Sequence, residues 1–298
     1  MQPTTQISIA EWNEAVARDA QETALAALED GQVLFFPQLA FKLTDAEARF
    51  LTPDLVGDSK NVSYQFGARK IGHCACAEAD KPAVAGMMHR FCGQAKVLVE
   101  NLLPAYQPKL TMGRASLRPV EAAGRAQSWR KDDTRLHVDS FPATPLNGKR
   151  ILRVFTNVNP AKDRVWIVAE RFPRLAARYA RDAGLPKYAD GSAWSGLKRA
   201  LSRVGLPVAD RAPYDEFMLH FHDWLKENSE FQTATTGKEQ ISFPPLATWL
   251  VYTDGVPHAA LSGQFAMEQT FIVPVDALVT PEVSPLRVLE KLAGRSMS

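Results

Sequence analysis

Three residues of this sequence, His137, Asp139 and His258, have the types and spacing to hold a metal ion. Side chains alternate between the two faces of an extended strand, so His137 and Asp139 would project together while Val138 points away. The distant imidazole of His258 would complete a set of two histidines and one carboxylate. This set is typical of non-haem Fe(II) and leaves neighbouring coordination positions open for a co-substrate and O2. The pattern therefore predicts oxidation by activated dioxygen.

The pattern His-x-Asp is short and occurs by chance, so its surroundings decide how it is interpreted. A polar turn at residues 132–134 precedes it, and a proline-containing loop at 141–148 follows it. Apolar runs that predict strands cover residues 151–155, 248–252 and 269–274. The ligands would then lie at strand ends, as a double-stranded β-helix (jelly roll) requires. The alternative, that His137 and His258 are hydrogen-bonded histidines without a metal, stays open.

Composition is typical of soluble globular proteins, since 46% of the 298 residues are hydrophobic, 23% are charged and the formal net charge is only +2. No apolar run approaches the ~18 residues of a membrane span, and we expect no signal peptide at the start of the sequence. The three cysteines, Cys74, Cys76 and Cys92, argue against a disulfide framework. We therefore expect a cytoplasmic location, where a reducing environment suits ferrous iron.

The order of the predicted elements indicates an α+β fold around one jelly-roll core. The expected parts are N-terminal helices at about residues 8–30 and 82–103, a β-core at about 105–170 and 240–275, and a helical insertion at about 172–232. The insertion includes a predicted helix at Trp194–Val204 and separates two halves of the β-core. Residues 1–298 are therefore expected to form a single domain.

The first part of the insertion is basic, with eight Lys or Arg and two Asp from Arg171 to Arg203. This cluster is either a solvated helix face or a rim that attracts an anionic substrate by charge complementarity. Nucleic acid is not the expected partner, because no nucleic-acid-binding module accompanies the charge.

Other candidate metal ligands are weaker. His73, Cys74 and Cys76 lie close together, but the second pair of ligands typical of structural zinc sites is missing. His220 and His222 lie two apart in a segment with helical periodicity and would not face each other. We interpret these two histidines as surface or packing residues.

Arginines of the strand regions could hold an anion beside the metal. Arg153 lies within an apolar run, where a guanidinium needs an anionic partner because its desolvation is costly. A bidentate pair with arginine suits the far carboxylate of 2-oxoglutarate, although a structural salt bridge would also satisfy Arg153. Arg118 is a second candidate of this kind, and Gln269 could donate a hydrogen bond to the same co-substrate.

Three blocks of the sequence resemble the Kdo 3-hydroxylase family, Fe(II)/2-oxoglutarate dioxygenases that act on the inner-core sugar of lipopolysaccharide. The blocks are residues 130–142, 148–160 and 252–271. The resemblance implies that His137, Asp139 and His258 bind iron, and that 2-oxoglutarate and O2 are co-substrates. Many relatives in the wider superfamily grip 2-oxoglutarate with an arginine shortly after the distal histidine. Residues 259–270 contain no arginine, so this role is expected to fall on Arg118 and Arg153.

The same resemblance implies a substrate, Kdo attached to lipid A, which is hydroxylated at carbon 3 to give Ko, with succinate and CO2 as co-products. This partner is anionic and lies at a membrane surface, so we expect peripheral contact with the cytoplasmic face of the inner membrane. The oligomeric state stays open. Two alternatives also stay open: a 2-oxoglutarate oxygenase that acts on another small molecule, and a non-catalytic jelly-roll module that binds a sugar or a metal.

Overall fold

The structure, a computed structural model, describes residues 2–125, 127–190 and 211–298. The strands are β1 (Thr4–Gln6), β2 (Val33–Phe36), β3 (Val62–Gln65), β4 (Lys70–Gly72), β5 (Thr111–Arg118), β6 (Arg150–Asn157), β7 (Arg164–Val168), β8 (Glu239–Phe243), β9 (Thr248–Tyr252), β10 (His258–Ser262) and β11 (Ala266–Val273). The α-helices are α1 (Arg18–Glu29), α2 (Asp45–Ala48), α3 (Lys81–Leu102), α4 (Phe172–Tyr179), α5 (Leu185–Ala189), α7 (Pro213–Glu227), α8 (Ser229–Thr233) and α9 (Pro285–Ala293).

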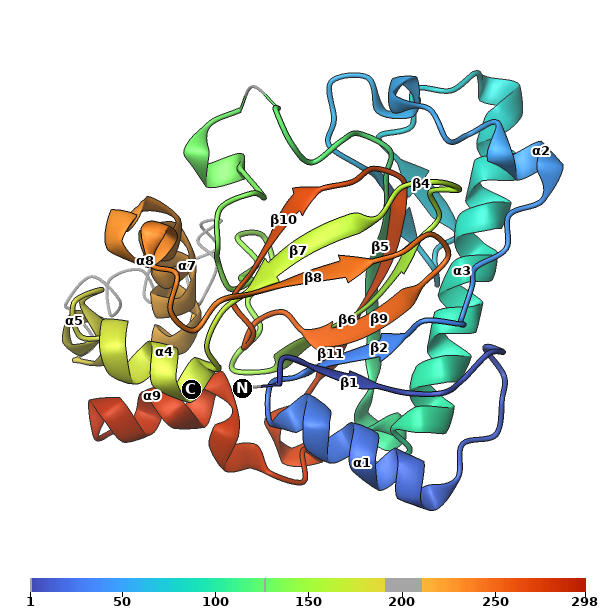
Figure 1. The fold of residues 1–298 in the computed structure, drawn as a ribbon. Helices are drawn as coiled ribbons and strands as arrows, with labels where there is room; N and C mark the ends of the chain where they lie inside the picture. The colour runs from blue at the N-terminus through green and yellow to red at the C-terminus, as the bar shows by residue number, and fades with distance from the viewer. Residues whose placement is uncertain (1, 126, 191–210) are drawn as a thin grey trace, which may run out of the picture.

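The strands form two sheets that enclose a common core (Figure 1). Among the described residues, the larger sheet has eight strands in the order β1-β2-β9-β6-β11-β5-β3-β4, and the smaller has three in the order β10-β7-β8. Strands β1 and β2 are parallel, whereas β6 is antiparallel to both β9 and β11. The larger sheet is therefore mixed, and the predicted α+β class is confirmed.

Aromatic side chains fill the space between the two sheets. Phe155 of β6 stacks on Trp249 of β9, with ring centroids 5.3 Å apart. Phe243 of β8 stacks on the same indole at 3.9 Å, and Trp166 of β7 meets Phe155 edge-on at 4.9 Å. Such ring pairs stabilise the core beyond the apolar area that they bury.

Helices α1 and α3 lie against the outer face of the larger sheet (Figure 1). Helix α3 buries residues three and four apart, the spacing of one helix face: Val84, Met87, Met88, Phe91, Ala95, Leu98, Val99 and Leu102. Leu152 and Val154 of β6 belong to the same core cluster. Since Phe155 faces the aromatic layer, β6 is covered on both sides, and all of its residues are buried.

The N-terminal helices were predicted only in part. The helix expected at about 82–103 is confirmed as α3. The helix expected at about 8–30 was wrong in its first half, because α1 begins at Arg18 and residues 4–6 form strand β1. Trp12 gives the physical reason. Its indole Nε1 donates to the carbonyl of Ala40 at 2.9 Å, and its ring packs against α3 and the loop after β2, so tertiary contacts override the helical pattern.

Helices α4, α5, α7, α8 and α9 gather at one end of the two sheets (Figure 1). The first four lie within residues 172–233, between β7 and β8 in the chain, where the helical insertion was expected at about 172–232. The helix predicted at Trp194–Val204 lies outside the described residues. None of the helices in the described part of the chain is long and apolar enough to cross a membrane.

We expect Trp249→Ala to lower the free energy of unfolding by about 3–5 kcal/mol, because the substitution removes an indole that is fully buried between two stacked rings. Urea unfolding followed by circular dichroism would measure the loss. Val279→Ala, at a side chain that is 65% exposed, is the control and should change this free energy by less than about 0.5 kcal/mol. Similar losses in the two variants would contradict the described core.

Candidate active site

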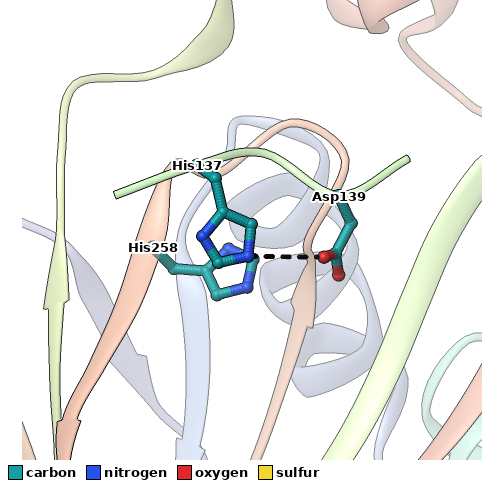
Figure 2. Close-up of side chains that lie close together, drawn as sticks. All are labelled: His137, Asp139 and His258. Atoms are coloured by element: carbon teal, nitrogen blue, oxygen red, sulfur yellow. Dashed lines mark ion pairs between the residues drawn. The ribbon is translucent and has the colours of Figure 1, made fainter. Parts of the chain in front are cut away.

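His137, Asp139 and His258 converge on one point at the edge of the aromatic core (Figure 2). Their ligand atoms all lie within 4.8 Å of one another, and His137 Nε2 is 3.7 Å from Asp139 Oδ1. Both histidines are buried, and the His258 ring stacks on Trp166 with centroids 5.0 Å apart. The structure thus brings together the three residues that the sequence singles out.

Residues 130–147, which carry His137 and Asp139, are called the ligand segment. Backbone hydrogen bonds hold this segment against the start of β10. The amide of His137 donates to the carbonyl of His258 at 3.1 Å, and the reverse bond is 2.9 Å long. The amide of Asp139 donates to the carbonyl of Thr253 at 2.8 Å. The expected strand around His137 is reduced to this single bridge, yet Val138 still points away, into the helical core, so the alternation holds.

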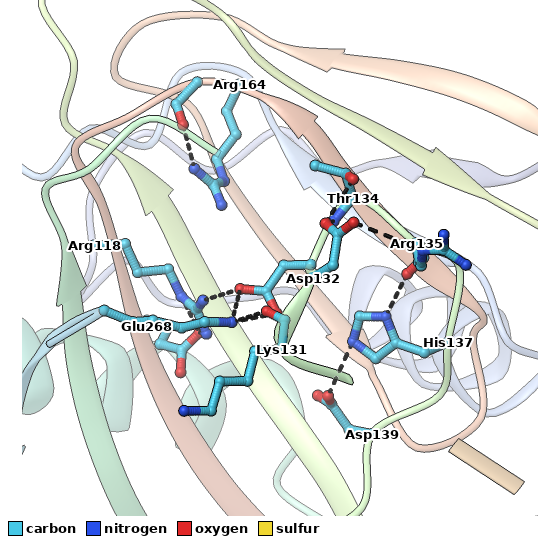
Figure 3. A network of polar contacts seen from close by, with 12 residues as sticks. Arg118, Lys131, Asp132, Thr134, Arg135, His137, Asp139, Arg164 and Glu268 are labelled. Atoms are coloured by element: carbon cyan, nitrogen blue, oxygen red, sulfur yellow. Dashed lines mark hydrogen bonds and ion pairs between the residues drawn. The ribbon is translucent and has the colours of Figure 1, made fainter. Parts of the chain in front are cut away.

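Each imidazole is oriented through its Nδ1 atom. His137 Nδ1 lies 2.7 Å from the carbonyl oxygen of Arg135 (Figure 3), and His258 Nδ1 lies 2.9 Å from that of Val256. Because a carbonyl can only accept, Nδ1 carries the proton and Nε2 keeps a free lone pair. Burial lowers the pKa of both histidines below the ordinary value, and the neutral form is the one that binds a metal.

Arg153 forms ion pairs with two carboxylates of the site. Its Nη2 lies 3.0 Å from Asp139 Oδ2, and its Nη1 lies 3.2 Å from Glu268 Oε1. Burial acts to raise the pKa of Asp139, but the Arg153 guanidinium and the two imidazoles outweigh it and hold this pKa well below its usual range. Asp139 is therefore ionised and oriented.

Arg118 is paired as well, within a chain of charges on the inner face of the larger sheet (Figure 3). Its Nη2 lies 2.7 Å from Glu268 Oε2, and its Nη1 lies 3.6 Å from Asp133 Oδ2. Lys60 Nζ approaches the Asp133 carboxylate at 3.1 Å. Both arginines predicted to grip a co-substrate thus already have protein carboxylates as partners.

A cavity of about 110 Å³ lies beside the three candidate ligands, between the two sheets. Its walls include Arg118, Asp133, Arg153, Phe155, Arg164, Trp166 and Ala260. Arg164, at the start of β7, differs from the other two arginines because no carboxylate of the described chain pairs with it. Its Nη1 donates to the carbonyl of Gly263 at 2.9 Å, and its buried Nε has no hydrogen-bond partner.

Arg164 was not predicted as a site residue, because in the sequence it is only a polar residue at the start of a short strand. Burial and the charge of Arg118 lower the pKa of Arg164 to about 10. The one signal that could have found it is alternation along β7, which places Arg164 on the same face as Trp166. That signal is informative only once the buried face of β7 is known.

Gln269 is not brought to this cavity. It is paired in register with Val154 of β6 and Ala115 of β5, and both belong to the outer core under α3. Its neighbour Glu268 occupies the inner face, so Gln269 points to the opposite face. Its amide nitrogen donates instead to the carbonyls of Gly113 and Thr270. The expected contact of Gln269 with the co-substrate is therefore withdrawn.

Helix α7 supports the ligand segment through side-chain bonds to its backbone. His222 Nδ1 lies 2.8 Å from the carbonyl of Val138, and its ring meets that of His137 edge-on at 4.8 Å. Lys226 Nζ donates to the carbonyl of Arg130 at 2.9 Å. The interpretation of His222 as a surface or packing residue was incomplete, because it touches the ring of His137 and the backbone carbonyl of the next residue, Val138.

The support continues on both sides of these contacts. In α8, the Gln232 side chain accepts from the amide of Leu136 at 3.0 Å and donates to its carbonyl at 2.8 Å. Near the start of α7, the Asp215 carboxylate accepts from the amides of Leu146 and Asn147, each at 2.9 Å. The irregular chain from residue 130 to 147 is therefore fastened to α7 and α8 along its length.

The other groups singled out in the sequence lie elsewhere. Cys74 Sγ and Cys76 Sγ are 2.9 Å apart, whereas Cys92 is buried within α3. The His220 ring stacks on Tyr188 of α5. Of the described part of the basic cluster, Arg171 pairs with Asp30 and Arg178 with Glu230, which is typical of a solvated helix face.

Comparisons with known proteins agree with this geometry. A family model described as 3-deoxy-D-manno-oct-2-ulosonic acid (Kdo) hydroxylase matches residues 11–296. The chain is 38% identical to the Kdo hydroxylase KdoO, a non-haem Fe(II) α-ketoglutarate-dependent dioxygenase. Its structure with α-ketoglutarate and Fe(III) superposes with a TM-score of 0.90, covering 99% of this chain and 97% of that one. The cobalt(II) complex of KdoO gives a TM-score of 0.91 at the same identity and coverage. No curated protein sequence matches the chain significantly.

We expect Asp215→Ala to lower the free energy of unfolding by about 1–3 kcal/mol, because the amides of Leu146 and Asn147 would lose their acceptor. Hydrogen exchange followed by mass spectrometry should show faster exchange at residues 141–147. The control Asp223→Ala removes a carboxylate that pairs with Arg130 at the surface and should cost less than about 1 kcal/mol. Unchanged exchange at 141–147 in Asp215→Ala would contradict the supporting role of α7.

Proposed function

The chain belongs to the Kdo hydroxylase family of Fe(II)/2-oxoglutarate-dependent dioxygenases, and from this premise we propose that it hydroxylates Kdo at carbon 3 in Kdo-lipid A. The product would be Ko, with succinate and CO2 as co-products. The observation that carries the proposal is the convergence of His137, Asp139 and His258 beside a buried, arginine-lined cavity. The inner strands and the smaller sheet would form the jelly-roll core of a single domain.

The donor set fits ferrous iron. Two Nε2 lone pairs and one ionised carboxylate face the same point, and each imidazole is fixed by a backbone carbonyl at its far nitrogen. Asp139 Oδ2 is buried and makes no hydrogen bond, although Arg153 lies beside it. We therefore assign His137, Asp139 and His258 as the iron ligands. When bound, the iron supplies the redox chemistry that couples decarboxylation of 2-oxoglutarate to hydroxylation.

The protein's own contribution is to orient the reactants and to limit the access of water. Arg153 keeps Asp139 ionised and fixed, and Glu268 holds Arg153 and Arg118 in place from the neighbouring strand. The indole of Trp166 and the ring of Phe155 form an apolar wall of the cavity. An apolar wall lowers the local dielectric constant and so strengthens the electrostatic attraction between arginine and a bound carboxylate.

Arg164 is the residue that we assign to the far carboxylate of 2-oxoglutarate, with Arg118 beside it. Arg164 is buried, lines the cavity and lacks a carboxylate partner in the described chain, whereas Arg118 and Arg153 are already paired. Arg164 donates to the carbonyl of Gly263, five residues after the distal ligand His258. Strand β7 thus places a guanidinium in the part of the site where residues 259–270 contain no arginine.

The proposed acceptor and location are those expected of an enzyme of this family. Kdo-lipid A carries carboxylates and phosphates and is held in a membrane, so the enzyme would contact the cytoplasmic face of the inner membrane as a peripheral protein. Mass spectrometry of lipid A-core from cells with and without the chain tests this function directly. One added oxygen on Kdo, present only with the chain, is the expected result, and an unchanged mass would contradict it.

We expect His137→Ala to abolish iron-dependent succinate formation, because the metal would lose one of three protein ligands. Cys76→Ala, at a thiol that is not part of the three-residue cluster, should keep near-wild-type activity. Succinate release with Kdo-lipid A as acceptor, measured by liquid chromatography, would compare the two variants. Equal losses would overturn the assignment of the iron ligands.

We expect Arg164→Gln to raise the dissociation constant of 2-oxoglutarate by about tenfold or more, because a charge-assisted hydrogen bond is lost. Its affinity for iron should stay close to that of the wild type, since Arg164 forms no ion pair with Asp139. Arg153→Gln is the matched comparison and should weaken iron binding as well, because it removes the partner of Asp139. Calorimetric titration of each ligand separates the two effects, and unchanged 2-oxoglutarate binding in Arg164→Gln would refute its role.

A further inference from the structure

A second hollow, of about 390 Å³, adjoins the metal cavity, and we call it the β5–β11 groove. Its floor is the inner face of these two strands: Gly113, Arg114, Ser116, Glu268, Thr270 and Ile272. Its opposite wall is the loop formed by Phe141, Pro142, Ala143, Thr144 and Leu146. Arg153 lines both the groove and the metal cavity, so the two hollows are neighbours that meet at this side chain.

The loop wall is fixed relative to the iron ligands. It begins two residues after Asp139, and the Asp215 carboxylate holds its far end through the amides of Leu146 and Asn147. The Phe141 ring lies 5.6 Å from the Arg153 guanidinium carbon, which places an aromatic surface where the groove meets the metal cavity. Whatever occupies the groove is therefore presented to the metal in a defined position.

Arg114 is the exposed cation of this groove. It lies on the same strand as Ser116 and Arg118, and although β5 is bulged between Met112 and Ala115, all three line the hollows on the inner face of the sheet. Arg118 and Arg153 are paired with Glu268, but no carboxylate in residues 2–125, 127–190 or 211–298 pairs with Arg114. Its guanidinium is therefore available to an anionic ligand.

Arg114 lies four residues from Arg118, at most about 13 Å along the bulged strand. An anion held there would lie beyond the reacting carbon, on another part of the same acceptor. The groove also offers the hydroxyl groups of Ser116, Thr144 and Thr270 and the apolar faces of Phe141 and Pro142. Hydroxyl groups beside flat apolar surfaces are suited to a sugar, which has polar edges and apolar faces.

We propose that the β5–β11 groove holds the glycan of the acceptor and that Arg114 binds one of its oxyanions, a carboxylate or a phosphate, away from the reacting carbon. This inference rests on the proposed function, because it identifies how the same active site recognises its anionic substrate. It assigns to Arg114 a role in acceptor binding and none in binding iron or 2-oxoglutarate.

The test is the binding of Kdo-lipid A, in detergent micelles, to the metal-free full-length protein by titration calorimetry. Arg114→Gln should raise the dissociation constant about tenfold, as expected for the loss of one charge-assisted hydrogen bond. Arg114→Lys should lose less, because it keeps the charge. Lys42→Gln, an equal loss of charge at an exposed residue before α2, is the control and should bind like the wild type.

A second variant, Thr144→Trp, places an indole in the exposed wall of the groove and should abolish acceptor binding while leaving 2-oxoglutarate affinity unchanged. Acceptor from which the lipid A phosphates have been removed distinguishes the two oxyanions. If the Arg114→Gln defect persists, the partner is a sugar carboxylate, and if it disappears, the partner is a phosphate; either result supports the groove.

Equal affinities in Arg114→Gln, Lys42→Gln and the wild type would overturn the proposal, provided that the wild type hydroxylates Kdo-lipid A. A wild type that neither binds nor hydroxylates this acceptor would overturn the proposed function itself. The two failures are therefore distinguishable by the behaviour of the wild type.

Discussion

The structure depends on hydrogen-bond partners for an irregular stretch of backbone, residues 130–147, that carries two of the three proposed iron ligands. Polar groups of a buried backbone must be paired, and this stretch makes few backbone bonds to β10: the His137–His258 bridge and the bond from the Ala260 amide to the Asp133 carbonyl. Side chains of α7 and α8 supply the missing partners at Arg130, Leu136, Val138, Leu146 and Asn147. The helices between β7 and β8 thus position the metal site from the side opposite the sheets.

Charge balance is the second organising feature of the site. Asp139, Glu268 and Asp133 neutralise Arg153 and Arg118 within a chain of ion pairs on the inner sheet face. Arg164 lies outside this balance, because within the described part of the chain it donates to the backbone carbonyl of Gly263 and pairs with no carboxylate. An unpaired guanidinium is costly to bury, so the cavity favours an anion more strongly than the paired arginines alone would allow.

The sequence predicted the structural features that depend on patterns between residues close together in the chain. Alternation around Val138 places His137 and Asp139 together, and the periodicity of residues 82–103 identifies α3. It could not predict the partners of Arg118 and Arg153, because Glu268 lies more than one hundred residues away and reaches them only through strand register.

The misplacement of Gln269 has the same origin. Composition does not tell which face of an almost fully buried strand meets the cavity, since both faces of β11 carry apolar or paired residues. His222 was underestimated because helical spacing says which residues share a face of α7 and nothing of what packs against it. The first half of the predicted N-terminal helix failed because the contacts of Trp12 are tertiary.

The dependence of the ligand segment on α7 bears on how this scaffold can change. A β-sheet scaffold is often regarded as an interchangeable frame on which loops and inserted helices vary freely. Here an inserted helix holds the peptide that bears His137 and Asp139. A chimera that transplants the two sheets without α7 would remove the partners of the Val138 and Arg130 carbonyls, so the inserted helix and the proposed metal site are expected to evolve together.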